Sequence, residues 1–189
     1  VFVSHVHYDH YNPDILKLRR QRQNIWYLFS DDVPMPDEQK QVIRLSPEEE
    51  RRVNGIRVRT LPSTDEGVAF WIEYQGIVIY HAGDLNWWHW AGEGDSDNLA
   101  ARDEYFKELE RIPRVSMNIV FFPVDARQAV AREWGVKAFL EKFDVSTALV
   151  PMHAFGIRWS PSYEFRWRFP DIPLWIPKAE GDVYVGEVK

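Results

Sequence analysis

The sequence predicts a mixed fold of the α/β or α+β class that contains a substantial β-sheet. Short β-type runs interleave with segments of helical periodicity along the chain. Many of the apolar runs end at glycine, proline or aspartate, which commonly follow strands. A chain of 189 residues is long enough for one domain that buries about two thirds of the surface of its unfolded form. We therefore expect residues 1–189 to form a single domain.

Local signals predict the elements of the first part of the chain. The segment Asn12-Pro13-Asp14 supplies an N-cap, a proline in the first turn and an acid near the helix start, so we expect a helix over residues 12–23. The acidic run 48–50 indicates a solvated helix start. Apolar runs predict short strands over residues 1–4, 25–29, 42–45 and 56–61.

The second part of the chain is predicted to begin with a β-hairpin. Strands over residues 68–74 and 77–81 are joined by Gln75-Gly76, a two-residue spacing typical of a tight turn. An acidic loop is expected over residues 92–98. Periodicity then predicts helices over residues 99–112, 131–143 and 163–168, and strands over 119–122, 147–150, 174–176 and 183–185.

Composition excludes several classes of function. The chain has no cysteine, so it has no disulfide, no thiolate nucleophile and no cysteine-bound zinc. Lys plus Arg is 23 and Asp plus Glu is 29, a net charge of −6 that argues against a general nucleic-acid binder. There is no apolar run of about 18 residues and no signal-like N-terminus, so we expect a soluble, cytoplasmic protein without a membrane partner.

The clearest motif is H-x-H-x-D-H over residues 5–10, between a short strand and a predicted helix. Histidines two apart in an extended segment point the same way, so His5 and His7 can converge on one cation. Asp9 and His10 lie in the following turn and can reach a second cation. Zinc accepts imidazole nitrogen and carboxylate oxygen, and a catalytic site leaves one position for water. The alternative is a solvated polar loop.

Two further candidate ligands follow other predicted strands. Asp84 comes after the strand that ends near residue 81, and His153 follows the strand over residues 147–150. A Gly-Asp turn alone is more often an Asx-turn, but together with the first motif it favours a metal ligand. We therefore expect Asp84 and His153 to join the same site.

These residues resemble the metallo-β-lactamase-fold hydrolase superfamily over most of the chain. The resemblance implies a four-layer αββα sandwich with metals at one edge. It implies that His5 and His7 serve one metal, that Asp9, His10 and His153 serve the other, and that Asp84 bridges both. Residues 63–68 are most similar to small bacterial members of the ascorbate-6-phosphate lactonase-like branch.

The sequence departs from this family in two respects. Ser63 stands where the family has a third histidine for the first metal, and a serine hydroxyl is a poor zinc ligand. Either Asp65 or a water completes the first site, or one metal is held by Asp9, His10, Asp84 and His153. The family also begins with a β-hairpin and a strand that this sequence lacks, so we expect a fragment truncated at its N-terminus.

Other residues near Asp84 are weaker candidates. Asn86 and His89 are expected contacts to metal or substrate, although a lone histidine more often makes a local hydrogen bond. Aromatic residues are 15% of the chain, with 9 Trp, and Trp87, Trp88 and Trp90 either line the metal cleft or pack in the core.

The sequence thus predicts a metal-dependent hydrolase that acts on an ester, lactone or phosphodiester bond of a small-molecule substrate. One or two zinc ions are the expected cofactor, with manganese or iron as alternatives. Asp9 is the expected catalytic residue, which orients water or accepts its proton. Two alternatives are a catalytically silent metal-binding domain with an aromatic cleft and an RNA-processing nuclease. The oligomeric state is not predicted.

Overall fold

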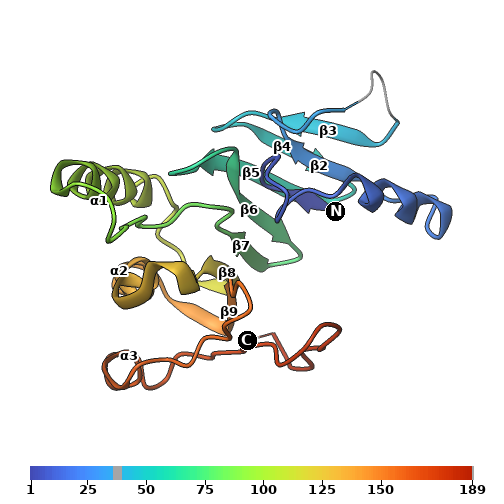
Figure 1. The fold of residues 1–189 in the computed structure, drawn as a ribbon. Helices are drawn as coiled ribbons and strands as arrows, with labels where there is room; N and C mark the ends of the chain where they lie inside the picture. Colours follow the sequence, from blue (N-terminus) through green and yellow to red (C-terminus); the bar gives the residue numbers. More distant parts are fainter. Residues whose placement is uncertain (36–39, 189) are drawn as a thin grey trace.

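The fold is that of a computed structural model, which describes residues 1–35 and 40–188 (Figure 1). Within these ranges the strands form two sheets. Sheet A contains, in order, β1 (Phe2–Val3), β2 (Tyr27–Ser30) and β3 (Val42–Leu45). Sheet B contains, in order, β4 (Glu50–Val53), β5 (Ile56–Pro62), β6 (Val68–Tyr74), β7 (Ile77–His81), β8 (Met117–Pro123) and β9 (Val145–Met152).

Helices connect or follow these strands. The helices are the 3₁₀ helices η1 (Pro13–Arg20) and η2 (Ala126–Ala131) and the α-helices α1 (Asp95–Leu109), α2 (Trp134–Leu140) and α3 (Tyr163–Arg168). Among the described residues, no helix has the length and apolar character needed to cross a membrane.

The strand directions bring several strand ends to one edge of sheet B. Strands β4 to β7 are antiparallel neighbours, whereas β7, β8 and β9 are parallel and are linked through α1 and α2. Because β5 and β7 both run antiparallel to β6, they run in the same direction. The carboxyl ends of β5, β7, β8 and β9 therefore lie at the same edge, which is where loops of open α/β sheets form sites.

Alternation along the strands divides the apolar residues among the layers. In β6, Val68 and Phe70 face sheet A, while Ala69 and Trp71 join the cluster beneath α1 and α2. In β2, Leu28 faces sheet B, and its neighbours Tyr27 and Phe29 pack toward η1. The order of layers is therefore η1, sheet A, sheet B, and α1 with α2, which is the predicted αββα sandwich.

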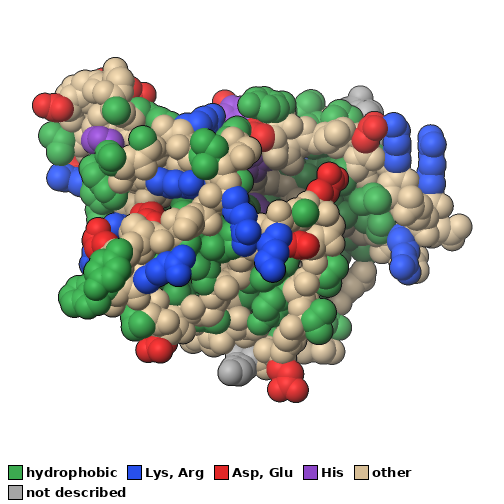
Figure 2. All heavy atoms as spheres, turned by 60° about the horizontal axis from the view of Figure 1, so that its bottom comes forward, with side chains coloured by type: hydrophobic (Ala, Val, Ile, Leu, Met, Phe, Trp, Pro, Cys, Tyr) green, Lys and Arg blue, Asp and Glu red, His purple; other side chains and the backbone are tan. Residues whose placement is uncertain are grey.

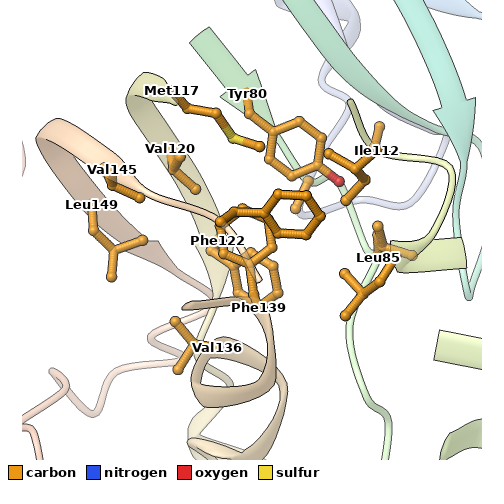
Figure 3. Packing of buried hydrophobic residues seen from close by; sticks show 14 of the residues in the cluster. Tyr80, Leu85, Ile112, Met117, Val120, Phe122, Val136, Phe139, Val145 and Leu149 are labelled. Atoms are coloured by element: carbon orange, nitrogen blue, oxygen red, sulfur yellow. The ribbon is translucent and has the colours of Figure 1, made fainter. Parts of the chain in front are cut away.

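The largest core cluster lies between sheet B and the helices (Figure 3). Phe139 of α2 stacks on Tyr80 of β7, with ring centroids 5.7 Å apart, and contacts Phe122 of β8 at 4.9 Å. All three side chains are fully buried. These aromatic contacts fix α2 against the parallel strands whose ends carry the loops described below.

Several predicted elements are confirmed. The hairpin strands coincide with β6 and β7, the helix over residues 163–168 is α3, and the strand over 42–45 is β3. The helix expected over residues 12–23 is the shorter 3₁₀ helix η1, which has no fully buried residue, so packing does not enforce an α-helix there. Helix α1 begins at Asp95, inside the expected acidic loop, because Asp95 and Asp97 suit the first turn of a helix.

Other predicted elements are wrong. Residues 48–50 do not start a helix, because β4 begins at Glu50 and pairs with β5 across the Asn54-Gly55 turn, a strong hairpin signal. Arg57 stabilises this pairing through ion pairs with Glu50 and Glu73 on the neighbouring strands. The helix expected over residues 131–143 is confirmed in its middle part as the shorter α2, whereas η2 ends at Ala131, where the predicted helix begins. Of the two strands expected near the C-terminus, residues 174–176 contribute only a single bridge, Leu174 to Leu149, and 183–185 form none.

We expect Phe139→Ala to lower the free energy of unfolding by about 3–5 kcal/mol, because it leaves a cavity between α2 and the parallel strands. Denaturant titration measures this change. Val115→Ala, at an exposed side chain, is the control and should change stability by less than about 0.5 kcal/mol. A loss below about 1 kcal/mol in Phe139→Ala would contradict the described packing.

Candidate metal centre

Loops that follow five strands meet at the edge of the sandwich. The segment over residues 5–10 follows β1, and Ser63 to Glu66 follow β5. Asp84, Asp125 and His153 follow the parallel strands β7, β8 and β9. In the space-filling view, histidine side chains lie inside a hollow with acidic and basic side chains near its rim (Figure 2).

The histidine motif forms a sharp turn that is held from two sides. The backbone N–H groups of His10 and Tyr11 both donate to the carbonyl of His7, at 2.9 and 2.8 Å. The carboxylate of Asp32, in the loop after β2, accepts a hydrogen bond from the backbone N–H of Val6 at 2.9 Å. This turn places His10 beside His5, with ring centroids 4.0 Å apart.

The potential ligands form two groups. The first group is His5, His7 and Asp84, and the second group is Asp9, His10 and His153. Within each group, the potential ligand atoms lie within 4.8 Å of one another.

The Asp84 carboxylate lies between the two groups. Its Oδ2 atom is 3.5 Å from Nε2 of His5. Its Oδ1 atom is 3.1 Å from Nε2 of His10 and 2.8 Å from Nε2 of His153. One carboxylate thus faces both groups with different oxygens, which is the arrangement expected of a bridging ligand.

The donor atoms fit a divalent cation. Nε2 of His5 is buried and has no hydrogen-bond partner among the described residues. Nε2 of His10 lies 2.9 Å from Nε2 of His153, and each of these nitrogens can donate a lone pair to a metal ion. Ligand atoms bound tetrahedrally to zinc are about 3.3 Å apart, since zinc–nitrogen bonds are 2.0–2.1 Å long. The observed separations around Asp84, from 2.8 to 3.5 Å, include this value.

Protonation also suits metal binding at His5 and Asp84. Burial lowers the pKa of His5 to about 4, although the nearby Asp84 opposes this shift, so the ring is neutral at pH 7. Burial acts to raise the pKa of Asp84, but contacts with His10 and His153 outweigh it and hold this pKa well below its usual range. A neutral imidazole and an ionised carboxylate are the forms that coordinate metals.

Ser4 orients two of the histidines. Its Oγ atom is 3.0 Å from Nδ1 of His5 and 3.0 Å from Nδ1 of His10. A hydroxyl oxygen has two lone pairs, so Ser4 can accept hydrogen bonds from both Nδ1–H groups. That arrangement leaves both Nε2 lone pairs directed at Asp84 and free for a cation.

Asp125 performs a similar role for His153, and the metal motif alone does not reveal it. Oδ2 of Asp125 is 3.2 Å from Nδ1 of His153, and the carboxylate is fully buried. Burial acts to lower the pKa of His153, but its hydrogen bonds to Asp125 and Asp84 outweigh it and raise this pKa to about 9. The signal for Asp125 is its place directly after a strand parallel to those that precede Asp84 and His153.

Two glycines allow the loops to approach closely. A Cβ atom at Gly67 would lie 2.0 Å from the carbonyl oxygen of Ser4 and 2.5 Å from Cβ of His5, at φ +69°. A Cβ atom at Gly83, at φ +56°, would lie 2.6 Å from the carbonyl oxygen of Val68. Only glycine suits these positions, because they combine a left-handed backbone with close backbone contacts.

Ser63 and Asp65 lie near the site but belong to neither ligand group. Oγ of Ser63 accepts a hydrogen bond from the backbone N–H of Asp65 at 3.3 Å. Burial and the nearby Asp84 carboxylate raise the pKa of Asp65. Glu66 comes closer to a ligand, with its carboxylate 3.4 Å from Nε2 of His7.

Asn86 and His89 make contacts with residues outside the two ligand groups. Asn86 is buried and its amide donates to Gln128 at 3.0 Å, so it holds η2 against the Asp84 loop. His89 packs on Trp134, with ring centroids 4.6 Å apart.

The tryptophans after Asp84 divide between the two expected roles. Trp88 and Trp90 line a cavity with Asp84, and their rings are stacked with centroids 5.7 Å apart. Trp87 instead packs against Phe106 of α1 and Trp134 of α2.

We expect Ser4→Ala to weaken zinc binding by about 10- to 100-fold, because both histidine rings lose the hydroxyl that orients them. Zinc titration with a competing chelator measures the affinity. Ser116→Ala, at an exposed serine, is the control. Equal zinc affinity in Ser4→Ala and the wild type would contradict this role.

Gly67→Ala should both destabilise the fold and reduce zinc binding, because the added methyl group separates the β6 start from the histidine motif. The expected loss of stability is at least about 2 kcal/mol. Gly76→Ala is the matched control, since Gly76 also has a positive φ, of +82°, but nothing within 4 Å of an added Cβ. Equal zinc content in the two variants would show that the close approach is not required.

Comparisons with known proteins add information on the fold. No family model and no curated protein matches the chain. The diiron β-hydroxylase CmlA from Streptomyces venezuelae is similar with a TM-score of 0.50 and 14% identity, over 82% of this chain and 35% of that chain. The metallo-β-lactamase fold protein YhfI from Bacillus subtilis is similar with a TM-score of 0.44 and 15% identity, over 81% of this chain and 63% of that chain.

The chain therefore spans about one third to two thirds of the length of these structures. The observed order of layers agrees with the αββα sandwich that the sequence resemblance implies. The protein has a mixed α+β sandwich with a metallo-β-lactamase-like fold.

Proposed function

We propose that this protein is a metal-dependent hydrolase that acts on an ester, lactone or phosphodiester bond of a small molecule. The observation that carries this proposal is the position of Asp84 between two groups of ligand atoms. His5, His7 and Asp84 would hold one cation, and Asp9, His10, His153 and Asp84 would hold the other. Zinc is the cation that we propose, with manganese or iron as alternatives.

A bound divalent cation lowers the pKa of a coordinated water toward neutrality and polarises a substrate oxygen. The protein supplies the remaining parts of the reaction. The carboxylate of Asp9, 3.8 Å from Nε2 of His10, is placed to orient the attacking water and accept its proton. Asp125 and Ser4 keep His153, His5 and His10 in fixed orientations.

The lactone alternative follows the resemblance of residues 63–68 to the ascorbate-6-phosphate lactonase-like branch, and it is part of this proposal. The diiron hydroxylase CmlA supports the inclusion of iron among the metals to be tested. Ser63 does not prevent a first cation in this proposal, because His5, His7 and Asp84 form a ligand group without it.

Three substrates test the proposal with protein loaded separately with zinc, manganese or iron. They are the ester 4-nitrophenyl acetate, the lactone dihydrocoumarin and the phosphodiester bis(4-nitrophenyl) phosphate. We expect at least one substrate to be hydrolysed, and the chelator EDTA to abolish this activity until metal is restored. Asp9→Asn should lower kcat by about 10²- to 10⁴-fold, because water loses its general base.

His89→Ala is the matched control, since His89 belongs to neither ligand group and packs on Trp134, and it should keep the wild-type rate. Activity that survives EDTA or a His7→Ala and Asp84→Ala double substitution would refute the mechanism. Tight metal binding without turnover by any metal form would instead support the catalytically silent domain.

A further inference from the structure

A cavity of about 270 Å³ opens beside Asp84, and its lining includes both aromatic and charged side chains. Trp88 and Trp90 form the aromatic wall. Arg127, Asp65 and Glu93 supply the charged side chains. Arg127 is the one cationic residue that lines the cavity in the described part of the chain.

The aromatic wall is held rigidly next to the ligands. Nε1 of Trp88 donates to the carbonyl of Asp84 at 2.9 Å, and its ring lies 5.8 Å from that of His153. The buried side chain of Asn98 fixes Trp90, because it accepts from the Trp90 N–H at 2.8 Å and donates to the Trp90 carbonyl at 2.9 Å. The Arg127 guanidinium lies 5.6 Å from the ring centroid of Trp90, so the cation and the indole pair border the same part of the cavity. Aromatic side chains of this kind suit a planar or ring-shaped ligand.

Arg127 is held in place but keeps one free edge. Its Nε and Nη2 atoms donate to Asp125, with distances of 3.0 and 2.6 Å, and its guanidinium lies 3.8 Å from the ring centroid of Phe155. Nη1 has no hydrogen-bond partner within residues 1–35 and 40–188. The side chain is 49% exposed, so the guanidinium is not enclosed by the protein.

The cavity favours an anionic ligand group only with the proposed cations bound, because the carboxylates of Asp65, Asp84 and Glu93 line it beside Arg127, the single cationic residue among the described lining residues. Asp65 and Glu93 line the same cavity but are not the ion-pair partners of Arg127. Within the described residues, its ion pair is with Asp125. Divalent cations at Asp84 would disfavour an ammonium group in this cavity and favour an anion. A guanidinium donates strong, directional hydrogen bonds to carboxylate or phosphate oxygens.

We propose that the substrate is a small compound with a carboxylate or phosphate group that binds Nη1 of Arg127 while a planar or ring-shaped part lies against Trp88 and Trp90. This proposal rests on the proposed function, since the reacting bond would lie over Asp84. Arg127 is then the residue that selects anionic substrates. Through Asp125 it is also connected to the ligand His153.

Binding of four matched ligands to the zinc-loaded protein tests this proposal. The ligands are phenyl phosphate, benzoate, benzyl alcohol and benzylamine, and tryptophan fluorescence and calorimetry report binding. We expect at least one anion to bind about 10-fold more tightly than the alcohol and the amine, because a charge-assisted hydrogen bond contributes this factor. The tighter of the two anions identifies the preferred group.

Arg127→Gln should weaken anion binding by about 10-fold and leave benzyl alcohol binding unchanged. Arg127→Lys keeps the charge and should weaken it less. Arg102→Gln, on the exposed surface of α1, is the matched control. If Arg127→Gln loses its fold or its zinc, the wild-type ligand series and Arg127→Lys decide the question, and amine or alcohol binding as tight as anion binding overturns the proposal.

Failure of this proposal is distinguishable from failure of the proposed function. If a substrate that carries the preferred anionic group is hydrolysed with the same kcat/KM by Arg127→Gln and the wild type, the role of Arg127 is refuted and the hydrolase is left intact. Anion binding that depends on Arg127 without hydrolysis of any substrate supports the anion site and refutes the hydrolase.

Discussion

Ser4 joins three of the loops that build the metal centre. Its carbonyl oxygen accepts a hydrogen bond from the backbone N–H of Val68 at 2.9 Å, which ties the end of β1 to the start of β6. Its hydroxyl contacts His5 and His10. This junction is tight enough that only glycine is accommodated at position 67 and at position 83, directly before Asp84. The relative positions of both ligand groups depend on it.

The remaining ligands depend on strand direction. Because β7, β8 and β9 are parallel, Asp84, Asp125 and His153 all emerge at the same edge, although they are far apart in the sequence. The aromatic core between Tyr80, Phe122 and Phe139 fixes these strands against α2. The buried core therefore determines how precisely the ligands meet, and rigid supporting elements are what a metal site requires.

The sequence alone predicts the parts of the site that are local. The histidine motif is contiguous, and the hairpin strands β6 and β7 carry a clear alternation and turn, so both could be predicted from residue order. Asp125 and Asp32 were not predicted, because each acts on a segment that is distant in sequence, and the one signal for Asp125 is its place directly after a strand. The anion-binding role proposed for Arg127 also depends on the fold, because β8 ends beside β9. The strand β4 was predictable in principle, since the Asn54-Gly55 turn marks its hairpin, but the acidic residues before it favoured a helix.

The metal content of the protein tests the central claim most directly. If Asp84 serves both ligand groups, protein saturated with zinc and freed of excess metal by gel filtration should contain two zinc ions per chain by elemental analysis. One zinc ion per chain or fewer would contradict a shared Asp84.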